Sequence, residues 1–66
     1  MSVARITEIT SSSTRSFEDA ITSGISRATK TLRQVQGAWI KEMKVVVNDD
    51  KVTEYRVDMK VTFVLE

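Results

Sequence analysis

The chain divides into three segments that resemble strands and one segment with the helical period. Residues 3–9 form a short β-branched segment, and residues 38–47 and 52–65 follow the period of two that is typical of strands. The helical segment lies between the first and second of these. The order predicts an α+β protomer of the β-α-β-β type. A Ser/Thr stretch over residues 10–14 is interpreted as the connection from the first strand to the helix.

The helical segment begins at Ser16 and carries its apolar residues three and four positions apart. The Ser16 hydroxyl can accept a hydrogen bond from the backbone, and Glu18 and Asp19 place negative charge at the positive end of the helix dipole. Gly37 is expected to end the helix in a left-handed cap. The apolar stripe consists of Phe17, Ala20, Ile21, Gly24, Ile25, Ala28, Leu32 and Val35.

Residues 48–51 (Asn-Asp-Asp-Lys) predict a tight turn that joins the last two strands into an antiparallel hairpin. A turn of this length fixes which residues face each other. One face then pairs Trp39 with Lys60, Lys41 with Asp58 and Met43 with Arg56, and the other pairs Ala38 with Val61, Ile40 with Met59 and Glu42 with Val57.

This register predicts a sheet with one apolar face, covered by the helix, and one mixed face. One helix covers one face only, so Trp39 is expected to lie outside the core of its own protomer. The apolar face should hold Ile40, Val46, Tyr55, Val57, Met59, Val61, Phe63 and Leu65, and the mixed face Trp39, Lys41, Met43, Val45, Glu54, Arg56, Asp58, Lys60 and Thr62.

The composition adds the expectation of an oligomer. The chain has 66 residues, which we interpret as one domain (residues 1–66), and it contains no Cys and no His. A core of this size contributes about 3–5 kcal/mol, so small domains use disulfides, metals or partner subunits. Disulfides and ordinary zinc sites are excluded here, which leaves homo-oligomerisation.

Charge and hydropathy exclude two classes of partner. Ten Lys and Arg residues stand against nine Asp and Glu residues, interspersed along the chain, so a nucleic-acid surface is not expected. No apolar run approaches the roughly 20 residues of a membrane span. A cytoplasmic protein is the expectation.

Catalytic and metal-binding motifs are also missing from the sequence. There is no glycine-rich phosphate loop, and the Ser/Thr stretch has no base to activate a nucleophile. Asp49-Asp50 lacks the alternating ligands of a calcium loop and is interpreted as a turn. We therefore expect neither an enzyme nor a metal site.

Trp39 is the residue that suggests a binding function, and three interpretations are open. It can fill an interface between subunits, where Trp is enriched, or pack against Lys60 by a cation–π contact. It can also be a stacking platform for a planar ligand, with Arg56, Lys60 or Lys41 supplying polar contacts.

The chain resembles the dodecin family along essentially its whole length. The resemblance implies a β-α-β-β protomer with one helix on one face of a three-stranded antiparallel sheet, assembled as a hollow homododecamer. It also implies binding and storage of flavin (FMN or riboflavin) stacked between Trp residues. The residues that carry it are Ser16-Phe17-Glu18-Asp19-Ala20, Arg27-Ala28, Thr31-Leu32-Arg33, Glu54-Tyr55 and Lys60-Val61-Thr62-Phe63-Val64-Leu65-Glu66.

Two positions depart from the family pattern. The position of the family's stacking Trp holds Gly37, with Trp39 two residues later on the same strand face, and the position of its flavin-contacting Gln holds Arg56. We expect a flavin-sequestering protein whose ligand-binding residues are Trp39, Arg56, Lys60, Gly37 and Lys41. The alternative is a shell without flavin that binds an ion or a phosphate-bearing metabolite, with Trp39 in an interface.

Overall fold

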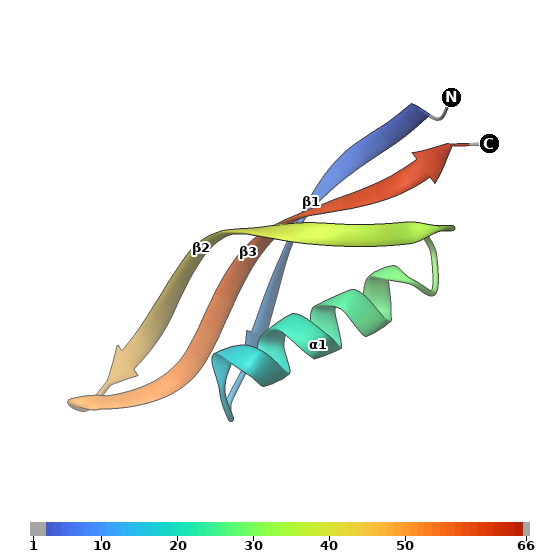
Figure 1. The fold of residues 1–66 in the computed structure, drawn as a ribbon. Coiled ribbons are helices and arrows are strands. Elements are labelled where there is room, and N and C mark those ends of the chain that lie inside the picture. Colours follow the sequence, from blue (N-terminus) through green and yellow to red (C-terminus); the bar gives the residue numbers. More distant parts are fainter. Residues whose placement is uncertain (1–2, 66) are drawn as a thin grey trace.

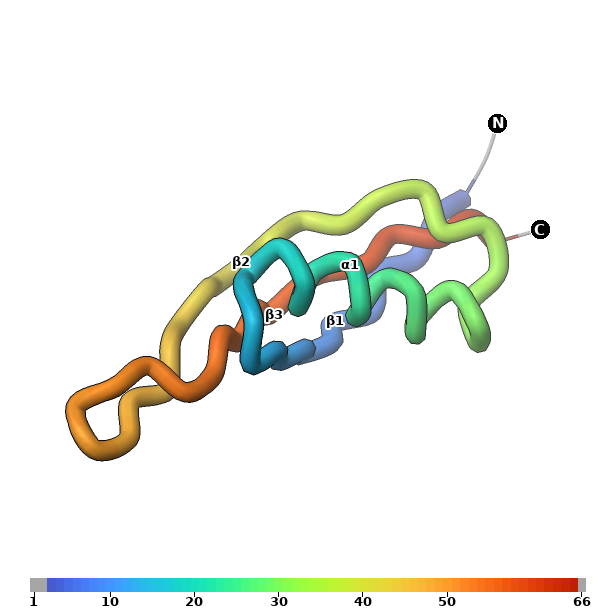
Figure 2. The backbone as a smooth tube through the Cα atoms, turned by 90° about the horizontal axis from the view of Figure 1, so that it is seen from below, coloured from blue at the N-terminus to red at the C-terminus, as the bar shows by residue number. Residues whose placement is uncertain are grey.

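The computed structural model describes residues 3–65 and confirms the β-α-β-β order. The elements are β1 (Val3–Ser13), α1 (Phe17–Ala28), β2 (Val35–Asn48) and β3 (Lys51–Leu65). The strands form one antiparallel sheet in the order β1-β3-β2. Helix α1 lies along one face of this sheet, and the β2–β3 hairpin projects beyond it (Figure 1, Figure 2). The other face, which α1 does not cover, is called the outer face below.

Strand β1 is longer than predicted. It runs to Ser13, and its last part pairs with β3 through partners such as Ser11 and Val57. The prediction that the Ser/Thr stretch forms the connection is therefore wrong for residues 10–13. The 15-residue β3 offers a hydrogen-bonding partner along this whole stretch, and that pairing outweighs the weak strand preference of Ser.

Helix α1 begins as predicted and ends early. Ser16 Oγ accepts a hydrogen bond from the Asp19 backbone N–H at 3.0 Å, which is the expected N-cap. The helix ends at Ala28 rather than near Gly37, and the left-handed residue is Gln34, with φ of 55°. Gly37 lies within β2, so its assignment as a helix cap is wrong.

The early end of α1 has a local cause. The hydroxyl of Thr29 donates a hydrogen bond to the carbonyl of Ser26, and the hydroxyl of Thr31 donates to the carbonyl of Ala28. These bonds favour a turn over further helix. Leu32 and Val35 still pack against the core, but from the connection and from the start of β2. The apolar stripe therefore extends beyond Ala28, where the helix ends, and this is why it predicted a longer helix.

The core lies between α1 and the central strand β3. Ala20 packs there against Val57, Met59 and Val61, which are all fully buried. Gly24 allows the close approach of the helix, because a Cβ atom at this position would lie 2.6 Å from Met59 Cε and 2.9 Å from Ser11 Cβ.

The hairpin keeps the predicted register at both ends and departs from it in the middle. Trp39 faces Lys60, and the turn pairs Asn48 with Lys51, as predicted. Register shifts between Ile40 and Glu42 and between Val46 and Val47 leave Lys41 and Thr53 without a facing residue. The two shifts cancel, so the strands leave the irregular stretch in their original alignment. A third shift lies at the start of β2.

Three predicted pairs are therefore wrong, and several side chains change face. Glu42 faces Asp58, Met43 faces Val57 and Lys44 faces Arg56. A shift of one residue moves a side chain to the opposite face. Met43 and Val45 thus lie on the side of α1, whereas Glu42 and Val46 lie on the outer face, in contrast to the prediction. Lys44 also lies on the outer face.

Candidate functional site

The outer face carries an open strip around Trp39. Trp39 is 66% exposed and faces Lys60 across the hairpin. Gly37 lies about 6–7 Å along the same strand face, from the rise of β-structure. A Cβ atom at Gly37 would have no other atom within 4 Å. The structure thus brings Trp39, Gly37 and Lys60 together, with free space over the glycine.

Lys41 lies beside this strip in a cluster of charges. Its Nζ atom donates to Glu8 Oε2 at 3.2 Å and lies 4.0 Å from Asp58 Oδ2. Since β3 is the middle strand, Lys41 reaches across it to a residue of β1. The bulge at Lys41 places it there, because a bulged residue is turned out of the regular ladder.

The protonation of this cluster is linked. Hydrogen bonds to Asp58 and to Lys41 lower the pKa of Glu8 below its ordinary value. The hydrogen bond to Glu8, together with desolvation, raises the pKa of Asp58. The hydrogen bond to Glu8 also raises the pKa of Lys41. The directions of the shifts agree with the geometry, because Lys41 Nζ lies 3.2 Å from the Glu8 carboxylate and 4.0 Å from that of Asp58.

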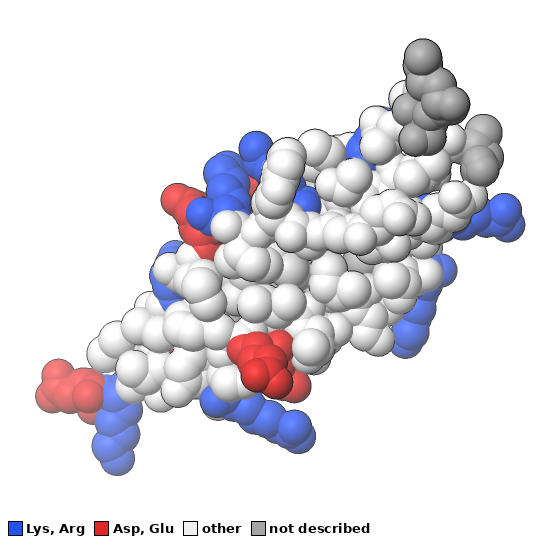
Figure 3. Space-filling view, in the orientation of Figure 1, with Lys and Arg blue, Asp and Glu red and all other residues white. Residues whose placement is uncertain are grey.

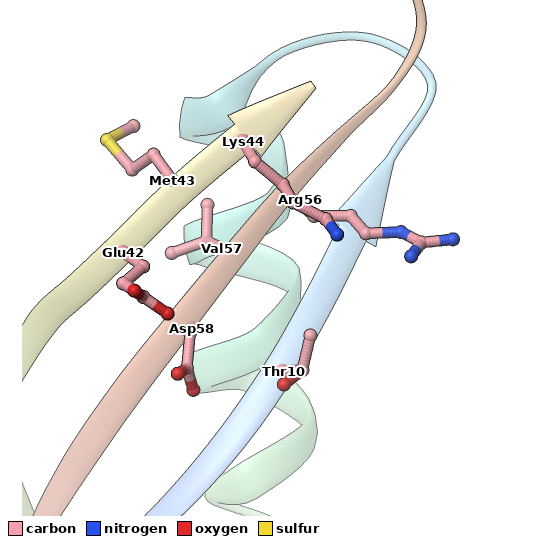
Figure 4. A pocket seen from close by; sticks show the side chains of 7 residues that line it. All are labelled: Thr10, Glu42, Met43, Lys44, Arg56, Val57 and Asp58. Atoms are coloured by element: carbon pink, nitrogen blue, oxygen red, sulfur yellow. The ribbon is translucent and has the colours of Figure 1, made fainter. Parts of the chain in front are cut away.

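A cavity of about 470 Å³ opens further along the outer face. Lys44 and Arg56 lie at one end of it and Glu42 and Asp58 at the other (Figure 4). Arg56 Nε donates to Glu54 Oε1 at 3.2 Å. The residues that line this outer-face cavity are Thr10, Glu42, Met43, Lys44, Arg56, Val57 and Asp58.

The predicted ligand-binding residues therefore fall into two places. Arg56 lies four residues along β3 from Lys60, or about 13 Å at a rise of about 3.3 Å per residue, so it belongs to the cavity and not to the strip around Trp39. Lys41 lies between them. Sequence reasoning missed Lys44 and Glu8, because their positions depend on the register shift and on the pairing of β1 with β3.

Two classes of site have no support in the described part of the chain. Over residues 3–65, no group of three or more acidic, His or Cys residues is arranged to hold a metal ion. The described residues also contain no helix with the length and hydropathy needed to cross a membrane.

Solved structures similar to this chain share its fold over nearly their whole length. Dodecin from Streptomyces davaonensis is 32% identical, with a TM-score of 0.94, and the match covers 98% of this chain and 96% of that one. An arginine-to-alanine variant of T. thermophilus dodecin is 33% identical, with a TM-score of 0.94 and coverage of 100% and 98%.

A more distant structure shows the fold alone. It is described as a calcium-chelating dodecin from Mycobacterium tuberculosis with a novel calcium-binding site. It is 23% identical, with a TM-score of 0.85, and the match covers 97% of this chain and 91% of that one.

The comparison by sequence gives the family directly. No curated protein matches the chain significantly. The family model described as Dodecin matches residues 3–66, which is nearly the whole sequence. Together with structural matches above 30% identity, this shows that the chain belongs to the dodecin family.

Proposed function

We propose that this protein binds and sequesters a flavin, FMN or riboflavin, on the outer face of its sheet. The observation that carries the proposal is the exposure of Trp39 on a face without a covering helix. A large aromatic ring in this position offers a flat apolar surface for a planar ligand. Membership of the dodecin family supports flavin as that ligand.

The surroundings of Trp39 favour a stacked ring. The empty space over Gly37 leaves room for a ring system that extends beyond the indole. Lys60 supplies an ammonium group on one side and Lys41 another, so carbonyl oxygens of a flavin would find hydrogen-bond donors. Stacking contributes about 0.5–1.5 kcal/mol per aromatic pair beyond the area that it buries.

The binding unit in this proposal is a homo-oligomer, most simply the homododecamer implied by the family. A symmetric assembly can bring two copies of Trp39 face to face across a two-fold axis and enclose ligands between them. The protein would act by binding and not by catalysis, since any redox chemistry would belong to the bound flavin.

The test is a titration with riboflavin and with FMN that follows Trp39 emission and flavin fluorescence together. Trp39 is the only Trp in the chain, so its emission reports on this site alone. We expect mutual quenching that saturates at a fixed ratio of ligand to protomer. Trp39→Ala should weaken binding about tenfold, Trp39→Phe less, and Val52→Ala at the hairpin end should have no effect.

Calcium enters the same experiment as a competing ligand, because it is the ion named for the M. tuberculosis structure. We expect calcium to leave the flavin quenching unchanged. The absence of any quenching by either flavin would contradict the proposed function. Displacement of flavin by calcium would instead support the ion-binding shell.

A further inference from the structure

Glu8 is a charged residue of the outer face that lies in the same row as Trp39. It faces Lys60 across the β1–β3 pair, and Lys60 faces Trp39 across the β2–β3 pair. Residues that face each other on neighbouring strands lie on the same face of a sheet. Glu8, Lys60 and Trp39 therefore form one row across the three strands, with the carboxylate at one end and the indole at the other.

The length of this row suits a fused ring system. Neighbouring strands lie about 4.8 Å apart, so the backbone of Glu8 is about 10 Å from that of Trp39 across the central strand β3. A three-ring system that stacks on Trp39 and extends over β3 therefore brings its far edge to Glu8. The side chain of Glu8 is 44% exposed, so a ligand can reach it.

Two cations flank the Glu8 carboxylate. Lys41 Nζ donates to Glu8 Oε2 at 3.2 Å. Lys60 faces Glu8 and makes neither a hydrogen bond nor an ion pair with any described residue. Hydrogen bonds to Asp58 and Lys41, and then the charges of Lys41 and Lys60, lower the pKa of Glu8, so it is an anion at neutral pH. The protein thus presents an acceptor between two donors.

The carboxyl groups here have unused capacity to accept hydrogen bonds. Lys41 carries the one ammonium group within 4.0 Å of either Glu8 or Asp58 in residues 3–65. Asp58 Oδ1 is buried and has no hydrogen-bond partner within the same residues. A carboxylate has about four lone-pair sites, and buried polar atoms normally have a partner. A further N–H donor at this place, which a ligand can supply, would therefore be favourable.

The far edge of a flavin ring system has the complementary order of groups, because it is an imide with one N–H group between two carbonyl groups. We propose that Glu8 determines ligand specificity by accepting a hydrogen bond from the imide N–H of a ring stacked on Trp39, while Lys41 and Lys60 donate to the two carbonyl oxygens. The site then selects planar rings with an imide edge over planar rings without one. This inference rests on the proposed function, since it requires stacking on Trp39.

Riboflavin and its N3-methyl derivative form a pair of probes that differ only at the imide nitrogen. Both keep the ring that stacks on Trp39, but the methyl group removes the donor. In the titration that follows Trp39 emission and flavin fluorescence, the parent should bind riboflavin about tenfold more tightly than the derivative, as expected for a hydrogen bond to a charged group. Glu8→Ala should weaken riboflavin binding by a similar factor and make the two affinities nearly equal.

Glu18→Ala is the matched control, because it removes a carboxylate from the exposed surface of α1, on the other face of the sheet (Figure 1). It should leave the preference for riboflavin unchanged. Native mass spectrometry checks that each variant forms the same oligomer as the parent. If Glu8→Ala fails to assemble, Glu8→Gln keeps the size of the side chain and removes its charge, and it should reduce the preference.

Two results would overturn the inference and leave flavin binding in place. One is equal binding of riboflavin and the N3-methyl derivative by the parent. The other is a preference for riboflavin that persists unchanged in the Glu8 variants, which would show that another group rejects the methyl. The absence of quenching by riboflavin in the parent would contradict the proposed function and this inference together.

Discussion

At the scale of single residues, the neighbouring carboxyl groups of Glu8 and Asp58 tie the stability of the protein to pH. The folded-state pKa of Asp58 is raised above its ordinary value of 3.8 by its hydrogen bond to Glu8 and by desolvation. Its contribution to stability is therefore complete below 3.8 and is lost as pH rises through the raised value. Glu8 has a lowered pKa, so its contribution is complete above 4.5 and is lost as pH falls through the lowered value.

The substitution Asp58→Asn separates these two effects. Asn cannot ionise, and its amide can still donate to Glu8. We expect the free energy of unfolding of the variant to stop falling as pH rises from the acid range to neutral, and to equal or exceed that of the parent at neutral pH. Urea unfolding over a series of pH values measures this.

Asp50→Asn in the turn is the control, because it makes the same chemical change outside the cluster and in a left-handed backbone conformation that Asn adopts readily. A pH dependence that is identical in Asp58→Asn and in the parent would show that the titration of Asp58 does not contribute to stability.

At the scale of elements, the two glycines have opposite roles, and alanine substitutions distinguish them. A Cβ atom at Gly24 would overlap with Met59 of β3 and Ser11 of β1, between α1 and the sheet, and such overpacking costs about 1–3 kcal/mol. Helix propensity returns about 1 kcal/mol. We expect Gly24→Ala to lower the free energy of unfolding by about 1 kcal/mol net.

Gly37→Ala should act in the other direction. Its Cβ would meet no atom within 4 Å, and removal of a glycine from a strand interior stabilises by about 0.5–1 kcal/mol. Denaturant unfolding of the two variants at one protein concentration compares them directly. A Gly24→Ala protein as stable as Gly37→Ala would contradict the close contact between helix and sheet.

The sequence was sufficient for features that depend on local chemistry. The Ser16 cap, the order of the elements and the facing of Trp39 and Lys60 follow from nearby residues and from the turn. The bulge at Lys41 could not be predicted, because the second shift at Thr53 cancels it and both hairpin ends keep their pattern. The end of α1 could not be predicted either, because Leu32 continues the apolar spacing of the helix and packs against the core although it lies after the helix.

The candidate site shows the same division. The exposure of Trp39 follows from the number of helices available to cover the sheet. The cavity end formed by Lys44 and Arg56 exists only in the shifted register, so a regular hairpin places Met43 there instead. The contact of Lys41 with Glu8 requires the pairing of β1 with β3, which the alternation of residues 3–9 did not specify.

At the scale of the whole molecule, the single protomer is elongated and leaves much of its apolar surface open. Its principal extents are 51 × 19 × 14 Å. Figure 3 shows a broad central area without charged groups, with most of the charges toward the margins of the view. The large apolar side chains that are exposed are Val3, Ile6, Trp39, Ile40, Met43, Val45, Val47, Val52 and Leu65.

This surface predicts that stability depends on assembly. A ligand or subunit that binds the folded state but not the unfolded state stabilises the protein. The denaturant midpoint of unfolding then rises as the concentration of that ligand or subunit rises. We expect the urea midpoint to rise with protein concentration and native mass spectrometry to show an oligomer, with twelve copies as the family implies. Val45→Asp places a charge on the side of α1 at the projecting hairpin, where apolar surface is exposed, and should shift the population toward smaller species.

The control for Val45→Asp is Thr22→Asp, which adds the same charge to the exposed surface of α1. If Thr22→Asp dissociates the oligomer equally, the hairpin is not the site of contact. A parent protein that is a folded monomer at micromolar concentration, with a midpoint independent of concentration, would show that the small core between α1 and β3 is sufficient by itself. Trp39 would then be exposed in the working protein, and enclosure of flavin between subunits would lose its physical basis.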